Sequence, residues 1–256
     1  MTSVIPVLLY HSVNDEPADE AWGAVSRAEF SAHVEAISVS GRAALNVTEL
    51  ADALRGERAI PERPVAITFD DGFDDTYDAV ETLARHGLTA TVYVTTGEVG
   101  ARNRLSPALI ADLAGHSAVE LGSHAVRHRP LDELDDRELD AEVRLSRAQL
   151  EDLIGASVHS FAYPHGAHDR RVRSAVVAAG YRSAAAVKNA VSHPRDDPFA
   201  IARWTVKGGT SAARLARVLE GDQVPRAWAR ERMRTRAYRS VRRGRRRLKH
   251  AIGVRC

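Results

Sequence analysis

Short apolar runs alternate with segments of helical periodicity along most of this chain. Seven runs have the length and the β-rich composition of strands, and they span residues 4–10, 65–69, 89–95, 118–122, 158–162, 182–187 and 200–206. Strands that alternate with helices pair in parallel, because each connection crosses back over the sheet. The pattern therefore predicts an α/β fold.

Helix signals lie between several of these runs. Ser26 and Glu29 have the spacing of a capping box, and the apolar residues that follow fall on one helical face until Gly41. Further helices are predicted over 74–86, from Ser106–Pro107 onward and over 168–179. Seven strands with intervening helices predict a distorted (β/α) barrel of about seven strands. In such barrels the chemistry lies at the C-terminal ends of the strands.

Composition narrows the class of protein. With 256 residues and 44% hydrophobic content, the chain can bury one sizeable core. Its only cysteine is Cys256, which excludes an intrachain disulfide and a cysteine-based metal site. The N-terminal sequence lacks the pattern of a secretory signal, and no apolar run has the length of a membrane span. We therefore expect a cytoplasmic protein.

Charge divides the chain into two parts. Residues 226–256 carry thirteen Lys and Arg residues against one acid, Glu231, although the net charge of the whole chain is only +2. We expect a catalytic domain over 1–224 and a basic tail over 225–256. A solvated charge run is one interpretation of the tail. Peripheral contact with an anionic membrane surface is another. Nucleic-acid binding is less favoured, because little base-reading machinery is visible.

Two adjacent carboxylates follow the apolar run 65–69. Asp70 and Asp71 precede Gly72, and neighbouring side chains on a strand point to opposite sides unless the chain turns. The two acids can then have different roles. The alternative is that Asp71 or Asp74 caps the next helix.

Two histidines four residues apart follow the run 118–122. On a helical turn, the spacing of His124 and His128 would place both imidazoles on one side. Histidines are also common in loops without any ligand. Together with a strand-end carboxylate, however, they would give three protein ligands and an open position, the arrangement of catalytic zinc sites.

Two more strand ends carry candidate residues. The predicted strand over 158–162 is followed by Pro164 and Gly166, which indicates a turn with backbone N–H groups free at the barrel mouth. His11 follows the first predicted strand and would lie at the same rim. A lone histidine there is more often structural.

These motifs together resemble the polysaccharide deacetylases, the NodB-homology domain of carbohydrate esterase family four. The resemblance runs from about residue 4 to residue 206, and its most specific pieces are Thr68-Phe69-Asp70-Asp71-Gly72 and Ser123-His124-Ala125-Val126-Arg127-His128. It implies that Asp70 is the general base, that Asp71, His124 and His128 hold a divalent metal, and that the Tyr163 N–H in the FAYPHG segment stabilises the oxyanion.

The chain departs from the common family pattern at two positions. Ala162 stands where many members have an arginine, and no downstream Leu-x-His supplies the usual acid. The segment Tyr10-His11 resembles a branch in which the last motif has moved to the front, so His11 is the candidate acid. Arg203, in Ala202-Arg203-Trp204, is the candidate replacement for the missing arginine.

The resemblance implies a metal-dependent hydrolase that removes acetyl groups, N-acetyl in particular, from a saccharide or glycolipid. Zinc is the metal that the ligands favour. One alternative is a carbohydrate-binding barrel without turnover, because the usual arginine and acid are missing. A non-haem iron oxygenase also uses two histidines and a carboxylate. Those enzymes usually have His-x-Asp on all-β scaffolds, which the alternation of strands and helices argues against.

Overall fold

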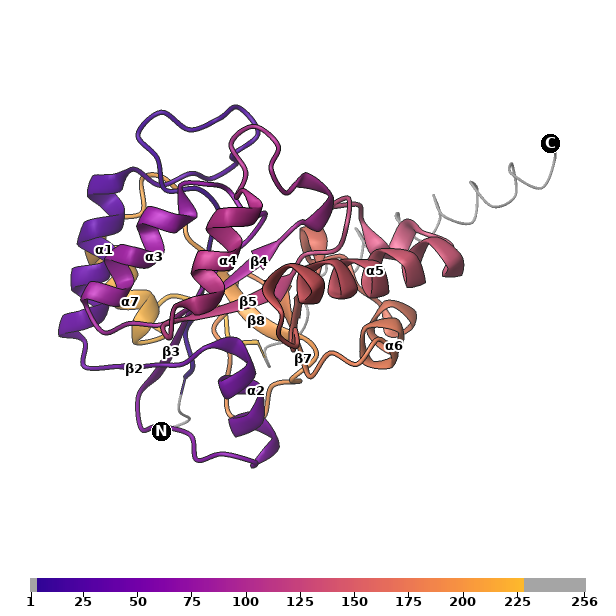
Figure 1. Ribbon diagram of the computed structural model, residues 1–256. Helices are drawn as coiled ribbons and strands as arrows, with labels where there is room; N and C mark the ends of the chain where they lie inside the picture. The colour runs from indigo at the N-terminus through magenta and orange to yellow at the C-terminus, as the bar shows by residue number, and fades with distance from the viewer. Residues whose placement is uncertain (1–3, 228–256) are drawn as a thin grey trace.

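Seven parallel strands close into a barrel in the computed structural model, which describes residues 4–227 (Figure 1). The strands are β1 (Val7–Tyr10), β3 (Pro64–Phe69), β4 (Ala90–Val94), β5 (Val119–Ser123), β6 (Ser160–Ala162), β7 (Ser183–Val187) and β8 (Ile201–Thr205). Their order is β1-β8-β7-β6-β5-β4-β3, and pairing of β1 with β3 completes the ring. The two-residue strand β2 (Ala43–Ala44) adds to β3 outside it. The predicted α/β barrel of seven strands is confirmed.

Helices connect the strands and surround the barrel. They are α1 (Arg27–Val39), α2 (Val47–Arg55), α3 (Thr76–Arg85), α4 (Pro107–Gly115), α5 (Asp136–Ile154), α6 (Arg170–Ala178) and α7 (Ala212–Leu219), with 3₁₀ turns η1 (Thr96–Glu98), η2 (Leu131–Glu133) and η3 (Pro164–Gly166). The Ser26–Glu29 capping box forms as predicted. Three helices were not predicted from the sequence, α2, α5 and α7, although Asn46 and Asp135 begin the first two with capping boxes.

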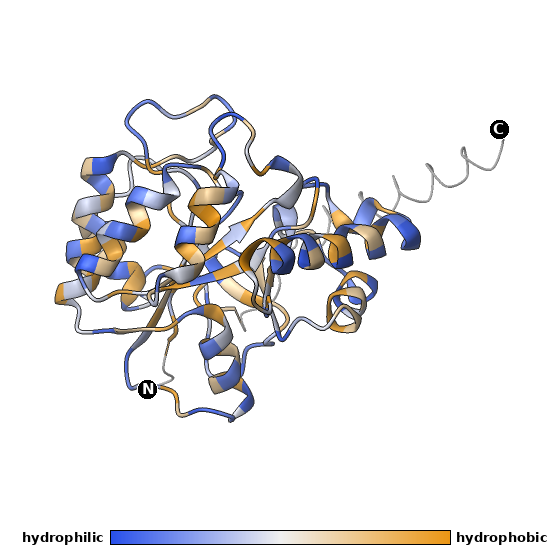
Figure 2. Cartoon of the chain, viewed as in Figure 1, coloured by the Kyte–Doolittle hydropathy of each residue, from blue (hydrophilic) through white to orange (hydrophobic). Residues whose placement is uncertain are grey.

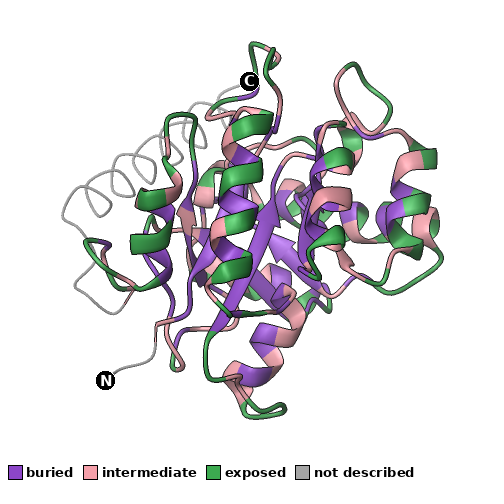
Figure 3. Cartoon of the chain, turned by 90° about the vertical axis from the view of Figure 1, so that its left-hand side faces the viewer, coloured by how far each residue is buried: buried purple, intermediate pink, exposed green. Residues whose placement is uncertain are grey.

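The core has two parts, a large cluster in which strand and helix residues pack together and a smaller cluster that contains strand residues such as Val7, Ala66 and Ile201. Every residue of β1, β3 and β4 is buried, as expected for strands covered on both sides. The helices alternate hydrophobic and hydrophilic residues along their length (Figure 2). Exposed residues lie on the outer surfaces of the helices and on the loops, while the barrel strands inside are largely buried (Figure 3). Among the described residues, no helix combines the length and apolar character that crossing a bilayer requires.

The predicted basic tail lies almost entirely outside the described residues. The described chain ends beside the barrel, where Val191 donates its N–H to the carbonyl of Pro225 and accepts the N–H of Ala227, at 3.0 Å each. The interpretations of residues 228–256 therefore remain predictions.

Candidate active site

The predicted site residues gather where the strands end. Asp70 and Asp71 follow β3, His124 and His128 follow β5, His11 follows β1, and Arg203 lies on β8. A cavity of about 570 Å³ opens at this end of the barrel, within the range of small-molecule sites. Its lining residues are Leu9, His11, Glu20, Trp22, Asp70, Asp71, His124, His128, His165, Val187 and Thr205.

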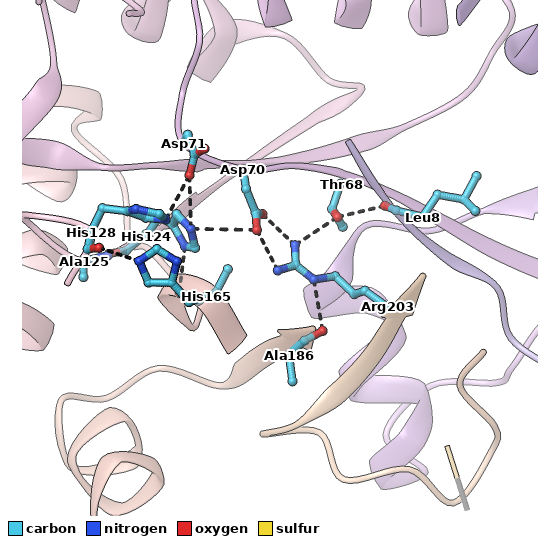
Figure 4. Close-up of polar contacts among 12 residues, drawn as sticks. Leu8, Thr68, Asp70, Asp71, His124, Ala125, His128, His165, Ala186 and Arg203 are labelled. Carbon is cyan, nitrogen blue, oxygen red and sulfur yellow. Dashed lines mark hydrogen bonds and ion pairs between the residues drawn. The ribbon is translucent and has the colours of Figure 1, made fainter. Parts of the chain in front are cut away.

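Asp71, His124 and His128 converge on one point (Figure 4). Asp71 Oδ1 lies 3.4 Å from His124 Nε2 and 3.2 Å from His128 Nε2, and one ligand atom from each residue lies within 4.8 Å of the others. That carboxylate oxygen is buried and makes no hydrogen bond. A buried acceptor without a donor is unfavourable unless a cation or water satisfies it. The three residues therefore fit a divalent metal ion.

The turn after β3 separates the two carboxylates. Asp71 and Gly72 both have a φ of 73°, in the left-handed region that glycine tolerates and aspartate rarely adopts. This conformation turns Asp71 toward the histidines, while Asp70 points to Arg203. The alternative interpretation as a helix cap is wrong, because α3 begins after Asp75 and without any side-chain cap.

The loop that carries the two histidines is not helical. Ala125 and His128 have φ values of 62° and 50°, so left-handed residues bring the imidazoles together, and their ring centroids are 4.9 Å apart. The proximity expected from the spacing is present, but a helical turn does not produce it.

Glu142 on α5 holds this loop from behind. Its carboxylate, with no exposed surface, accepts the backbone N–H groups of Val126 and Arg127 at 2.9 Å each and the Arg127 Nε at 2.6 Å. A buried carboxylate is stable only with such donors. Glu142 was not predicted from the sequence, although it lies on the apolar face of α5 with Leu139 and Val143, an unusual place for an acid.

His124 is oriented by the neighbouring strand. Its Nδ1–H donates to the carbonyl of Ala162 at 2.8 Å, which leaves Nε2 directed at Asp71. A backbone carbonyl on the second ring nitrogen is the usual device that orients a metal-binding histidine.

Asp70 forms a buried pair with Arg203 across the barrel. The guanidinium donates to both carboxylate oxygens, at 2.6 and 2.7 Å, and also to Thr68 Oγ1 at 3.1 Å (Figure 4). Arg203 is fully buried and Asp70 is 2% exposed. Thr68 in turn donates to the carbonyl of Leu8 at 2.8 Å. The structure thus places Arg203 against Asp70 with bidentate geometry.

Neighbouring charges set the ionisation of these groups. Burial alone would raise the pKa of Asp70, but Arg203 and His124 hold it below its ordinary value. Burial likewise opposes ionisation of Asp71, yet the two imidazoles keep the pKa of that carboxyl well below its usual range. Burial, with the nearby charge of His124, lowers the pKa of His128 to about 4. Both carboxylates are therefore charged near neutral pH, and His128 has a free lone pair.

His11 lies in the cavity beside these carboxylates. Burial lowers its pKa, while Asp70 and Asp71 oppose the shift. Its Nδ1 is buried without a hydrogen-bond partner. The ring meets Trp22 at 87°, with centroids 5.8 Å apart.

Tyr163 requires a correction. Its backbone N–H donates to the carbonyl of Ala185 at 3.1 Å, continuing the pairing of β6 with β7, and the fully buried residue does not line the cavity. The expected oxyanion role is therefore wrong in this structure. His165, two residues later, lies on the cavity instead, with its ring 4.4 Å from that of His128 and its Nε2 3.1 Å from the His128 carbonyl.

The sequence of this chain is similar to those of known proteins. The family model described as polysaccharide deacetylase matches residues 57–184, which is half of the chain. YxkH of Bacillus subtilis, a protein assigned to the polysaccharide deacetylases, is 24% identical over 217 residues, which cover 84% of this chain and 76% of YxkH. The poly-β-1,6-N-acetyl-D-glucosamine N-deacetylase of Escherichia coli K12 is 30% identical over 71 residues, 28% of this chain and 11% of the E. coli protein.

Solved structures share the fold. The Streptococcus pyogenes deacetylase PplD has a TM-score of 0.78 at 20% identity, with 86% of this chain and 99% of PplD covered. IcaB from Ammonifex degensii has a TM-score of 0.74 at 22% identity, with 85% and 97% covered. The family match spans Asp70, Asp71, His124 and His128, whereas His11 and Arg203 lie outside it. With that match, this chain belongs to the polysaccharide deacetylase family.

Proposed function

We propose that this protein is a metal-dependent hydrolase that removes N-acetyl groups from a carbohydrate. The observation that carries the proposal is the convergence of Asp71, His124 and His128 beside the Asp70–Arg203 pair in one cavity. This arrangement supplies ligands for a cation and a separate charged base next to it. An N-acetyl rather than an O-acetyl substrate is supported by the name of the E. coli relative, an N-deacetylase.

The ligand set favours zinc. One carboxylate and two imidazoles leave coordination positions open, as in catalytic zinc sites. When bound, the cation would act as a Lewis acid on the acetyl carbonyl and make water more acidic. The chain's contribution is to hold the three side chains in place through the Ala162 carbonyl and the Asp71 turn.

Asp70 is the general base of the proposed reaction. It takes a proton from the attacking water while Arg203 fixes both of its oxygens and so its orientation. The proposal is supported by the 3.8 Å distance between His124 Nε2 and Asp70 Oδ2, since a base must lie close to the proposed metal ligands. A carboxylate held ionised at this point can accept a proton near neutral pH.

His11 is the proposed acid that protonates the departing amine. Since burial lowers its pKa, His11 is neutral at rest and must gain its proton during the reaction. The water proton that Asp70 removes is the natural source, and its delivery to nitrogen balances hydrolysis of the amide to a carboxylic acid and an amine. The Tyr163 N–H has no part in this scheme.

Two variants separate the base from the metal ligands. We expect Asp70→Asn to keep its metal and lose about 10²–10⁴-fold in turnover. His124→Ala should lose the metal itself. The measurements are metal content of the purified proteins and acetate release from N-acetylglucosamine oligomers. Glu35→Gln, on the exposed side of α1, is a control that should leave both unchanged.

Two outcomes would contradict the proposal. Equal metal loss in Asp70→Asn and His124→Ala would remove the division of roles between base and ligand. Sugar binding by the metal-loaded wild type without acetate release would instead indicate a carbohydrate-binding barrel.

Cellular location and the basic tail stay predictions. The expected cytoplasmic location is tested by fractionation of cells that produce the full chain. Contact of residues 226–256 with an anionic surface is tested by sedimentation with anionic liposomes, and undiminished binding after removal of these residues would contradict it.

A further inference from the structure

We propose that Trp22 is a platform for a sugar residue next to the one that loses its acetyl group, so that the substrate is an oligosaccharide rather than a single sugar. The inference rests on the proposed deacetylase function and specifies its substrate. It is carried by the position, exposure and fixation of one indole side chain.

Trp22 combines exposure with a place in the active-site cavity. Its exposed fraction is 60%, and it lines the cavity that holds His11, Asp70 and the three candidate metal ligands. The other large hydrophobic residues found exposed in the described chain do not line that cavity, and they are Val39, Leu145 and Val177. Single exposed apolar residues are ordinary, so the location, rather than the exposure, distinguishes Trp22.

Contacts within the chain hold the indole in place without covering it. Lys207 Nζ lies 4.0 Å from the ring centroid, a cation–π contact, and the His11 ring meets the indole at 87°. The loop that bears Trp22 is closely packed on the loop after β8, because a Cβ at Gly208 would lie 2.7 Å from the Ala24 carbonyl oxygen. A side chain fixed before binding loses little rotamer freedom when a ligand arrives.

The chemistry of an exposed indole suits a sugar ring. The C–H groups on one face of a pyranose form an apolar surface that packs on an aromatic face, while its hydroxyls stay in water. A neutral N-acetylated glycan offers no charge for recognition, so such packing is a main source of affinity. Because Trp22 contacts His11, the proposed acid for the departing nitrogen, a sugar on the indole would adjoin the sugar undergoing reaction.

Chain-length dependence tests the proposal. Acetate release is measured on N-acetylglucosamine and on its β-1,4- and β-1,6-linked pentamers, with p-nitrophenyl acetate as a sugar-free acetyl ester. We expect Trp22→Ala to raise KM for the preferred pentamer at least about tenfold with kcat little changed, and Trp22→Phe to recover most of the loss. The loss on the pentamer should exceed the loss on the monomer and on the ester at least about tenfold. Leu145→Ala, which removes an exposed side chain from α5, is the matched control.

Equal losses on monomer and pentamer would overturn the proposal, because Trp22 would then act only by supporting His11. An unchanged KM for the pentamers would overturn it as well. Calorimetric titration of the pentamers into Asp70→Asn, with and without Trp22→Ala, separates this proposal from the proposed function. Binding that depends on Trp22 in a protein whose wild type releases no acetate would reject the deacetylase and retain the platform.

Discussion

Replacement of Arg203 by methionine tests the pair on which the proposed base depends. Methionine keeps much of the volume of the side chain but removes the donors to Asp70 and Thr68. Since Arg203 is fully buried and Asp70 is 2% exposed, the carboxylate would lose its bidentate partner at a point that has little contact with solvent. Removal of one partner from such a buried pair destabilises a protein by about 3–5 kcal/mol.

The substitution should also move the pH dependence of the reaction. Burial raises the pKa of Asp70, and in the wild type the charge of Arg203 is the largest of the effects that lower it again. Without Arg203 the pKa of Asp70 rises. A base must be deprotonated to act, so the acidic limb of kcat/KM should shift to higher pH, with a loss of about 10²–10⁴-fold in rate near neutrality.

Denaturant unfolding and a pH profile of kcat/KM measure the two effects. Arg173→Met is the matched control, because Arg173 pairs with Asp197 at 3.2 Å where both side chains are about two-fifths exposed. Surface pairs of this kind contribute at most about 1 kcal/mol. In an Asp70→Asn background, Arg203→Met should cause little further loss of rate. Full additivity of the two losses, or an unshifted acidic limb, would refute the assigned role of Arg203.

Two further predictions concern residues around the proposed metal ligands. Glu142→Gln should weaken metal binding by about 10–100-fold, because a neutral amide oxygen cannot replace the charged acceptor of three N–H groups in the loop that carries His124 and His128. Titration of metal into the metal-free protein measures the affinity. An unchanged affinity would show that this loop keeps its shape without Glu142. His11→Ala should lower kcat by about 10²–10⁴-fold at unchanged metal content; a rate equal to that of the wild type would exclude His11 as the acid.

The sequence predicted the barrel because its strands are short apolar runs that glycine and polar residues interrupt. The convergence of Asp71 with His124 and His128 was predictable for the same reason, since parallel strands present their C-terminal ends on one side. Periodicity alone did not indicate α5, where Glu142 interrupts the apolar face. The placement of Arg203 came from resemblance to a family branch, because no local pattern links residues 70 and 203.

Tyr163 shows what a sequence does not reveal. A strand that stops at proline leaves some N–H groups unpaired, but the register of the neighbouring strand decides which ones. Here β7 extends far enough for the Ala185 carbonyl to take the Tyr163 N–H. Trp22 was equally hidden, because a loop residue has no periodicity to place it against a barrel mouth.

The residues with left-handed backbone conformation around the site affect the order in which parts of the protein unfold. Four non-glycine residues at the site have a positive φ, namely Asp71, Ala125, His128 and His165. This backbone conformation costs a non-glycine residue about 1–3 kcal/mol. Packing on the barrel maintains these backbone conformations. Opening of the loops would relieve their conformational strain, whereas opening of the strands would not. We therefore expect the loops that carry these residues to open at a lower free energy than the barrel strands unfold, so that a bound metal ion would be lost before the fold.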